Sequence, residues 1–286
     1  MNGARPLLRV AFQGERGAFS EEAAMRLLGN EIEPVPRPTF EATFAAIEEG
    51  LADRILAPIE NSLAGSVHRS YDLLVESKLS IIGEVVISIA MNLIGVPGTT
   101  LEKIATVESH PVALAQCEQF FSAHSNLKRI AVEDTAGSVR EIMAADDLTR
   151  AAIAGRRAAE IYRGEILQEH LEDHRENYTR FLLLTAEAPR VAEEADKLSL
   201  VIQLSHQPGA LYHALGAFSL RNINMLKIES RPVQGHPWQY RFYLDLQAST
   251  NDSEVKEALG ELEHLTDSVR ILGCYPSAIR RAKNQT

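Results

Sequence analysis

The chain has 286 residues, 45% of them hydrophobic and 24% charged, with a formal net charge of -10 and a sequence pI near 5.4. This length suits two globular domains, and the composition is that of an ordinary globular protein. The acidic balance and the lack of a long Lys/Arg cluster argue against nucleic-acid binding as the main task, because phosphate contacts need a basic surface.

The chain gives no sign of a membrane or a secretory route. The N-terminal residues lack the long apolar run of a signal peptide. The longest apolar stretch, 81–96, is interrupted by Glu84 and Asn92 and makes a poor membrane span. Cys117 and Cys274 lie far apart in periodic segments, so we expect two buried, reduced thiols and a cytoplasmic location.

Strands and helices alternate over the first two-thirds of the chain, which predicts a doubly wound α/β fold. Ligands on such sheets usually bind where strand ends meet helix starts. We expect strands at 7–14, 53–61, 103–109, 128–134 and 151–155, and helices at 20–29, 39–50, 67–77, 110–124, 135–146 and 156–164.

The pattern changes after residue 185. Residues 186–197 contain Pro, Ala and mixed charges with little periodicity, which indicates a linker. Beyond it the order is βαββαβ, the ferredoxin-like split unit. We therefore expect two domains, 1–190 and 197–276. The second has strands at 198–205, 224–233, 240–248 and 268–276, and helices at 209–221 and 252–265.

Four stretches place small or polar residues between a strand and a helix. They are "FQGERGAFS", "PIENSLAGS", "ESHP" and "EDTAGS". Helix starts carry unpaired N–H groups and a partial positive charge, so together these stretches favour a carboxylate-binding cleft. The alternative is that Ser20, Ser66, Ser109 and Thr135 are ordinary N-caps.

Two further groups of polar residues follow or precede a predicted strand. Glu60, Asn61 and Ser62 could orient a substrate or form an Asx turn. Thr179 and Arg180 combine a hydroxyl with a guanidinium that can hold a carboxylate. Neighbours in a strand point to opposite faces, so this pair can share a ligand only if Thr179 lies in the preceding turn.

In the second domain, Gly209 stands at a strand-to-helix turn, where the backbone can approach a ligand closely. Glu229, Ser230 and Arg231 come just before Pro232. They indicate either a solvated edge strand or the contacts of a small amphoteric ligand.

The sequence gives no evidence for a metal or an organic cofactor, and we expect none. His170 and His174 have helical i, i+4 spacing, but no third ligand is evident, which favours a solvated helix face. "GERGAFS" lacks the Gly-Lys-Ser/Thr ending of a phosphate loop.

Six motifs in one order make the chain resemble the prephenate dehydratases that carry a C-terminal ACT regulatory domain. They are "PIENSLAGSVHRSYDLL", "SHPVALAQC", "EDTAGS", "NYTRF", "PGALYHAL" and "KIESRP", and the resemblance covers residues 10–275. Members of this family dehydrate and decarboxylate prephenate to phenylpyruvate, on the route to phenylalanine. The resemblance implies a carbon–oxygen lyase with a two-lobed fold of the periplasmic-binding-protein type and an active site between the lobes.

The resemblance also implies roles for individual residues. Thr179 matches the family's essential threonine, which is thought to donate a hydrogen bond or proton to the departing hydroxyl. Asn61, Ser109 and Gln116 match polar residues of the cleft, and Glu60 and Arg180 stand in the same motifs. From these motifs we expect Ser62, Gly65, Ser66 and Thr135 to bind the substrate.

The ACT motifs imply feedback inhibition by phenylalanine, bound between two subunits of a homodimer or homotetramer. The residues that would hold it are Gly209, Ala210, Leu211, Glu229, Ser230 and Arg231.

Two alternatives remain open. Many members have Gln where this chain has Val112, and Leu and Pro where it has Gln13 and Glu15, so the motifs look closer to arogenate dehydratases, which act on the amino analogue of prephenate. A non-catalytic amino-acid sensor could also use a two-lobed fold with an ACT domain. Such a sensor would need no donor for a leaving group.

Overall fold

The computed structural model describes residues 6–187 and 191–278. The chain divides into two compact units. The first comprises Met1–Lys78 and Val85–Leu183, and the second comprises Leu79–Glu84 and Leu184–Thr286. Each unit is described separately below.

The first sheet has the strand order β2-β1-β3-β11-β5, with β4 paired to β3. The apolar strand β1 lies next to the edge strand β2, pairs in parallel with β2 and β3, and has Val10, Ala11 and Phe12 fully buried. Helix α1 packs on β1 and β3, and α3 packs on β3. The elements are β1 (Leu8–Gln13), α1 (Phe19–Leu28), β2 (Ile32–Arg37), α2 (Phe40–Ala45), β3 (Arg54–Asn61), β4 (Gly65–Ser66), α3 (His68–Glu76), β5 (Ser80–Ser88) and β11 (Tyr178–Thr185).

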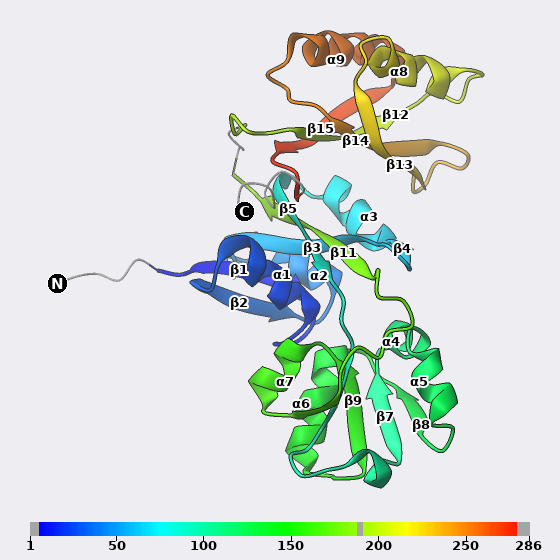
Figure 1. The fold of residues 1–286 in the computed structure, drawn as a ribbon. Coiled ribbons are helices and arrows are strands. Elements are labelled where there is room, and N and C mark those ends of the chain that lie inside the picture. The colour runs from blue at the N-terminus through cyan, green and yellow to red at the C-terminus, as the bar shows by residue number, and fades with distance from the viewer. Residues whose placement is uncertain (1–5, 188–190, 279–286) are drawn as a thin grey trace, which may run out of the picture. The chain divides into compact units, whose positions relative to one another are not determined.

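The second sheet has the order β10-β6-β9-β7-β8, with α6 and α7 on one side and α4 and α5 on the other (Figure 1). The chain enters this sheet after β5 and returns to the first sheet at β11, so the two predicted α/β lobes are confirmed. The elements are β6 (Asn92–Gly95), a 3-10 turn (Leu101–Lys103), β7 (Thr106–Ser109), α4 (Pro111–Ala115), α5 (Glu118–Ala123), β8 (Lys128–Ala131), α6 (Thr135–Ala145), β9 (Arg150–Ala154), α7 (Arg156–Tyr162) and β10 (Glu165–Gln168).

Several expectations for these lobes need correction. β2 was not predicted from the sequence, because Pro34 and Pro36 suggest a break. β2 is an edge strand, where a missing N–H is tolerated. β10 was likewise not predicted, and the helix predicted at 110–124 is two short helices, α4 and α5. In the part of the chain that the structure describes, no helix is both long and apolar enough to span a bilayer.

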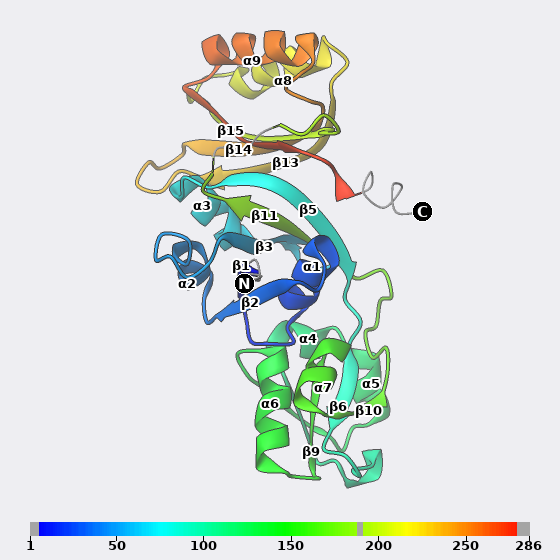
Figure 2. The same ribbon diagram turned by 90° about the vertical axis from the view of Figure 1, so that its left-hand side faces the viewer.

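The second unit contains the predicted βαββαβ domain. Its four antiparallel strands have the order β13-β14-β12-β15, and α8 and α9 cover one face of the sheet (Figures 1 and 2). Alternate residues of β12, among them Leu198 and Leu200, pack into the core between sheet and helices. The elements are β12 (Lys197–Gln203), α8 (Ala210–Ser219), β13 (Asn224–Pro232), β14 (Tyr240–Gln247), α9 (Ser253–Leu265) and β15 (Ser268–Tyr275). The predicted boundaries at 190 and 197 stay a prediction, since 188–190 lie outside the described residues.

Residues 79–84, the first part of β5, belong to the second unit. The carbonyl oxygen of Ile81 lies so close to Gly273 that a Cβ there would be 2.1 Å away from it. Arg270 Nη2 donates a hydrogen bond of 3.1 Å to the carbonyl oxygen of Leu79. The apolar segment 79–96 is thus divided between two strands and two units.

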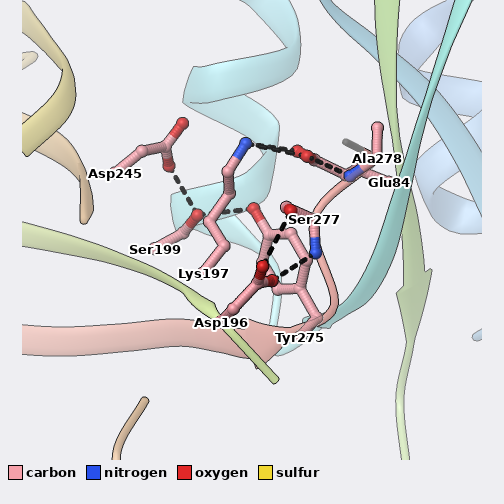
Figure 3. Close-up of polar contacts among 8 residues, drawn as sticks. All are labelled: Glu84, Asp196, Lys197, Ser199, Asp245, Tyr275, Ser277 and Ala278. Atoms are coloured by element: carbon pink, nitrogen blue, oxygen red, sulfur yellow. Dashed lines mark hydrogen bonds and ion pairs between the residues drawn. The ribbon is translucent and has the colours of Figure 1, made fainter. Parts of the chain in front are cut away.

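A buried ion pair fixes this segment to β12 (Figure 3). Lys197 Nζ lies 2.7 Å from Glu84 Oε1, and their side chains are 11% and 2% exposed. The backbone N–H of Ala278 donates to the same Glu84 oxygen at 2.8 Å. Asp196 accepts hydrogen bonds from the N–H (2.7 Å) and the hydroxyl (3.0 Å) of Ser277.

A second buried polar contact lies beside it. Ser199 Oγ donates to Asp245 Oδ1 at 2.5 Å and lies 2.7 Å from the Tyr275 hydroxyl (Figure 3). Because the single Ser199 proton is used on the carboxylate, the tyrosine is the donor to Ser199. These contacts join β12, β14 and β15 on the sheet without using its apolar core.

Candidate active site

Asn61 ends β3 with its side-chain amide held in one orientation. Its Oδ1 accepts the backbone N–H groups of Leu63 (3.0 Å) and Ala64 (2.8 Å), which is the Asx turn that the sequence allowed. Gly65, with φ of +83°, then returns the chain to pair with Asn61. Backbone N–H groups only donate, so the oxygen of Asn61 must face the turn and its Nδ2 must face the other way.

The Nδ2 group of Asn61 points at the start of β11. It lies 2.7 Å from Asn177 Oδ1, 2.9 Å from Thr179 Oγ1 and 3.1 Å from the Tyr178 carbonyl oxygen. Thr179 is only 9% exposed. Since the Thr179 oxygen accepts a hydrogen bond from the amide, its own proton is left to be donated elsewhere.

Asn177 continues the network toward the second lobe. It is fully buried, and its Nδ2 donates to Gln116 Oε1 at 3.0 Å. We call Asn61, Thr179, Asn177 and Gln116 the amide cluster. Because Gln116 Oε1 accepts this hydrogen bond, the Nε2 group of Gln116 points away from Asn177 and can donate elsewhere. Asn177 was not predicted as a site residue, and its one signal in the sequence is its place in "NYTRF".

Gln116 is positioned by the break between α4 and α5. It caps the C-terminus of α4, and its carbonyl oxygen accepts the N–H of Asp173 at 2.7 Å. The Asp173 carboxylate in turn accepts the first N–H groups of α5, from Glu118 (2.8 Å) and Gln119 (2.9 Å). Such capping satisfies free N–H groups at a helix start and favours negative charge there. The segment before β11 is therefore tied to the Gln116 turn.

Cys117, next to Gln116, is an inert thiol in this setting. It is fully buried, and burial, reinforced by the carboxylates of Asp173, Glu172 and Glu118, raises the pKa of Cys117 to about 12. Only a thiolate is an effective nucleophile. Cys117 and Cys274 are both buried free thiols, as the sequence predicted.

Ser62 uses its hydroxyl to join β3 to β11. Its Oγ donates to the Glu176 carbonyl oxygen (2.9 Å) and accepts the Tyr178 N–H (2.9 Å), and its own N–H donates to the Tyr178 carbonyl oxygen (2.8 Å). These three hydrogen bonds hold Asn61 opposite Thr179.

The predicted helix-start residues have other positions than expected. Ser109 is fully buried at the end of β7, and its Oγ donates to the Ile153 carbonyl oxygen at 2.6 Å. Thr135 opens α6, whose N-cap is Asp134. Ser20 lies inside α1 and Ser66 in β4. The interpretation of these four residues as N-caps is therefore wrong.

Arg180 and Glu60 lie within strands. Thr179 and Arg180 are consecutive residues of β11, so their side chains leave on opposite faces. The condition for a shared ligand, that Thr179 lies in the preceding turn, is not met. Glu60 precedes Asn61 in β3 and likewise points away from it. Neither charge belongs to the amide cluster.

The loop "FQGERGAFS" contacts helices α6 and α7 of the second lobe. A Cβ at Gly17 would lie 2.7 Å from the Ala158 Cα, so the glycine permits close packing on α7. Glu15 forms an ion pair with Arg140 at 2.7 Å. The fully buried Glu21 accepts hydrogen bonds from Arg16 and from the Gly17 N–H (2.8 Å).

The pKa of Glu21 is shifted by opposing effects. Burial by itself would raise the pKa of Glu21, but the Arg16 and Gly17 hydrogen bonds and the charges of Arg16 and Arg157 together lower it. Arg157 Nη2 lies 3.3 Å from Glu21 Oε1. The carboxylate therefore stays ionised between α1 and α7.

The predicted phenylalanine-binding residues all lie in the second unit. Gly209, with φ of +83°, is the N-cap of α8, which begins with Ala210 and Leu211. On the edge strand β13, Ser230 is exposed while Glu229 and Arg231 are half-buried. Helix α8 contacts β13, so the two motifs belong to neighbouring elements.

The described residues contain no group of three or more His, Cys, Asp or Glu side chains placed to hold a metal. His170 Nδ1 lies 3.1 Å from Glu172 Oε1. Residues 169–177 have no helical structure, so the predicted helix face carrying His170 and His174 is wrong.

Comparison with known proteins identifies the family. The Prephenate dehydratase family model matches residues 10–189, and the ACT domain model matches residues 199–264. The chain belongs to the prephenate dehydratase family. It is 41% identical to arogenate dehydratase/prephenate dehydratase 1 of Arabidopsis thaliana, over 96% of this chain and 73% of that protein. It is 34% identical to the bifunctional chorismate mutase/prephenate dehydratase of Enterobacter agglomerans, over 94% of this chain and 70% of that protein.

Two solved structures are similar over most of their length. The prephenate dehydratase of Arthrobacter aurescens in complex with L-Phe has a TM-score of 0.88 and 30% identity, covering 96% of this chain and 91% of that chain. GqqA, described as a novel type of quorum-quenching acylase, has a TM-score of 0.87 and 32% identity, covering 96% and 99%. The two similar structures thus have different described activities.

Proposed function

We propose that this protein is a dehydratase that converts prephenate to phenylpyruvate, with arogenate as the alternative substrate. The observation that carries the proposal is the hydrogen bond from Asn61 Nδ2 to Thr179 Oγ1. Because Thr179 Oγ1 is the acceptor in this bond, the Thr179 proton is available as a donor to a leaving hydroxyl. A non-catalytic sensor would need no such donor.

The reaction needs little from the enzyme beyond a fixed substrate conformation and a hydrogen-bond donor such as Thr179. The ring C–O bond breaks and the leaving hydroxyl takes up one proton from solvent to become water, the ring carboxylate leaves as CO2, and the electrons of the broken C–C bond complete the aromatic ring. The enzyme must hold one conformation and assist a poor leaving group. An alcohol is too weak an acid to transfer its proton before the C–O bond is largely broken. We therefore assign Thr179 the stabilisation of negative charge that grows on the leaving oxygen. One such donor is typically worth ~3–4 kcal/mol, a hundred- to thousandfold in rate.

Gln116 supplies a second donor from the same cluster. Its Nε2 group is turned away from Asn177, so it is available to a substrate carboxylate or to the leaving oxygen. Two neutral donors fit a substrate whose ring carboxylate must lose its charge as CO2, because a cation there would stabilise the ground state more than the transition state. This role for Gln116 does not need Arg180.

The substrate test compares prephenate and arogenate directly. The purified protein is incubated with each, and phenylpyruvate is followed by absorbance while phenylalanine is measured by amino-acid analysis. We expect turnover of at least one substrate, loss of most of kcat in Thr179→Val, and retention of activity in Thr179→Ser. Wild-type protein that converts neither substrate would overturn the proposal. An equally active Thr179→Val variant would remove the assigned role.

A second candidate activity comes from the similarity to GqqA. The same preparation is therefore incubated with an acylated quorum-sensing signal, and release of the acyl group is measured. Hydrolysis of that signal without turnover of prephenate or arogenate would favour the acylase.

We further propose that phenylalanine binds the ACT domain of a homodimer or homotetramer in the cytoplasm. The L-Phe complex of the Arthrobacter aurescens relative supports the ligand. Calorimetry on full-length protein, with its mass measured in solution, is the test, because the site is proposed to need two subunits. A monomer, or a full-length protein that phenylalanine neither binds nor inhibits, would overturn this regulation.

A further inference from the structure

The hydrogen bonds of the amide cluster run in one direction. Backbone N–H groups of Leu63 and Ala64 donate to Asn61 Oδ1, which forces Asn61 Nδ2 toward Asn177 Oδ1. With its oxygen accepting, Asn177 must present Nδ2 to Gln116 Oε1, 3.0 Å away. Side-chain amides are otherwise ambiguous in orientation, but the backbone donors at one end of this chain settle all three.

Asn177 is the central member of this chain and has no access to a substrate. It is fully buried. Its carbonyl oxygen accepts the N–H of Ile89 at 2.8 Å, and the next residue, Tyr178, is fixed to Ser62 through N–H and carbonyl. The backbone of Asn177 is thus immobilised on both sides, which leaves its amide little freedom to turn.

We infer that Asn177 is a positioning residue that sets the Gln116 amide as a donor and links it to Thr179 through Asn61. If Asn177 were absent, Gln116 Oε1 would lose its partner and the amide could present either its oxygen or its nitrogen. The effect on rate rests on the proposed dehydratase activity, whereas the effect on Gln116 orientation does not.

The competing role is purely structural, a buried amide that ties β3 to the Gln116 turn. A matched control is available in Asn92, which is 2% exposed and donates to the backbone carbonyls of Ala90 (3.4 Å) and Ala154 (3.3 Å). Asn177→Ala and Asn92→Ala both remove one buried amide. We expect kcat to fall about a hundredfold only for Asn177→Ala, since misplacement of a substrate-positioning group has effects of this size.

Asn177→Asp is the sharper variant, because it keeps the size and the acceptor but removes the donor. Its carboxylate can accept from Asn61 Nδ2, but it can bind Gln116 only if that amide turns over and donates Nε2. The Gln116 oxygen would then face the reacting groups. We expect kcat of Asn177→Asp to fall at least as far as that of Asn177→Ala, with less change in KM than in kcat.

The decisive measurements are a double-mutant comparison and a crystal structure. If Asn177 acts through Gln116, Asn177→Ala in a Gln116→Ala background should lower kcat no further. If the two residues act independently, the fold-losses in kcat of the two single variants would multiply. In Asn177→Asp crystals, Gln116 Nε2 should lie against the carboxylate that the substitution introduces.

The inference is overturned if Asn177→Ala keeps kcat within about threefold of Asn92→Ala, if the two effects multiply, or if Gln116 is unchanged in the Asn177→Asp crystals. A wild type that converts neither substrate would count against the proposed function alone, because the crystal structures still test the orientation of Gln116.

Discussion

Lys197 Nζ and Glu84 Oε1 lie 2.7 Å apart in a buried ion pair between residues 113 positions apart in the chain. Removing one partner should cost more than removing both, because it leaves a buried charge. We expect Lys197→Met to lower the free energy of unfolding by about 3–5 kcal/mol.

The control for Lys197→Met is the surface pair Arg69–Glu41, whose side chains are 42% and 56% exposed. Arg69→Met should cost less than about 1 kcal/mol. Urea unfolding of both variants and of the double variant Glu84→Gln/Lys197→Met checks the prediction. An equal loss for Lys197→Met and Arg69→Met would contradict it.

Gly273→Ala should destabilise the protein by about 1–3 kcal/mol, as overpacking does. The added Cβ would lie 2.1 Å from the Ile81 carbonyl oxygen, and moving either backbone to relieve this clash costs free energy. Gly260→Ala, inside α9 with nothing within 4 Å of its Cβ, is the matched control. It should stabilise by about 0.4–1 kcal/mol. Thermal unfolding distinguishes the two, and a neutral Gly273→Ala would show that β5 is not held there.

Asn61→Asp should abolish most of kcat with little change in the fold. Aspartate still accepts the Leu63 and Ala64 N–H groups, but it cannot donate to Thr179 Oγ1. The Thr179 proton would then be donated to the introduced carboxylate and not to the leaving oxygen. Steady-state kinetics with circular dichroism as the folding control test this. A rate near wild type would mean that the Asn61 amide does not orient the hydroxyl.

Cys117 should resist alkylation in the folded protein. Burial and the neighbouring carboxylates raise the pKa of Cys117 to about 12. At pH 8 roughly one thiol in ten thousand is then the reactive thiolate. Peptide mass spectrometry after iodoacetamide treatment should find Cys117 unmodified until urea is added. Rapid labelling of native protein would be evidence that the Gln116 turn opens.

Glu21 should contribute to stability only above acidic pH. Its pKa in the folded protein is lowered, despite the opposing effect of burial, by Arg16, Gly17 and Arg157. Its contribution is therefore fully present above the unfolded value near 4.5 and is lost as the pH falls through the lower folded value.

Urea midpoints at neutral pH and below about pH 4 test the Glu21 prediction against a Glu21→Gln variant. The stability gap between wild type and variant should shrink in acid. A gap that does not change with pH would assign the role of Glu21 to packing alone.

The sequence by itself determined the elements whose signals are local. Alternating apolar residues and the glycine stops predict β1, β3 and the βαββαβ order of residues 197–275, because strand and helix periods are written in neighbouring positions. The Asx turn at Asn61 was one of two interpretations that the local sequence allowed. Gln116 was identified only through the family resemblance, whereas Thr179 was also marked by its place beside Arg180 before a strand.

Tertiary structure decided what depends on distant partners. Asn177 meets Gln116 61 positions away, and Asn61 meets Thr179 118 positions away. Those pairings exist only because β11 returns beside β3, and no local pattern encodes a hydrogen bond over that separation. The assignment of residues 79–84 to the second unit and the break that positions Gln116 have the same origin, since long-range packing overrides local preference where the two compete.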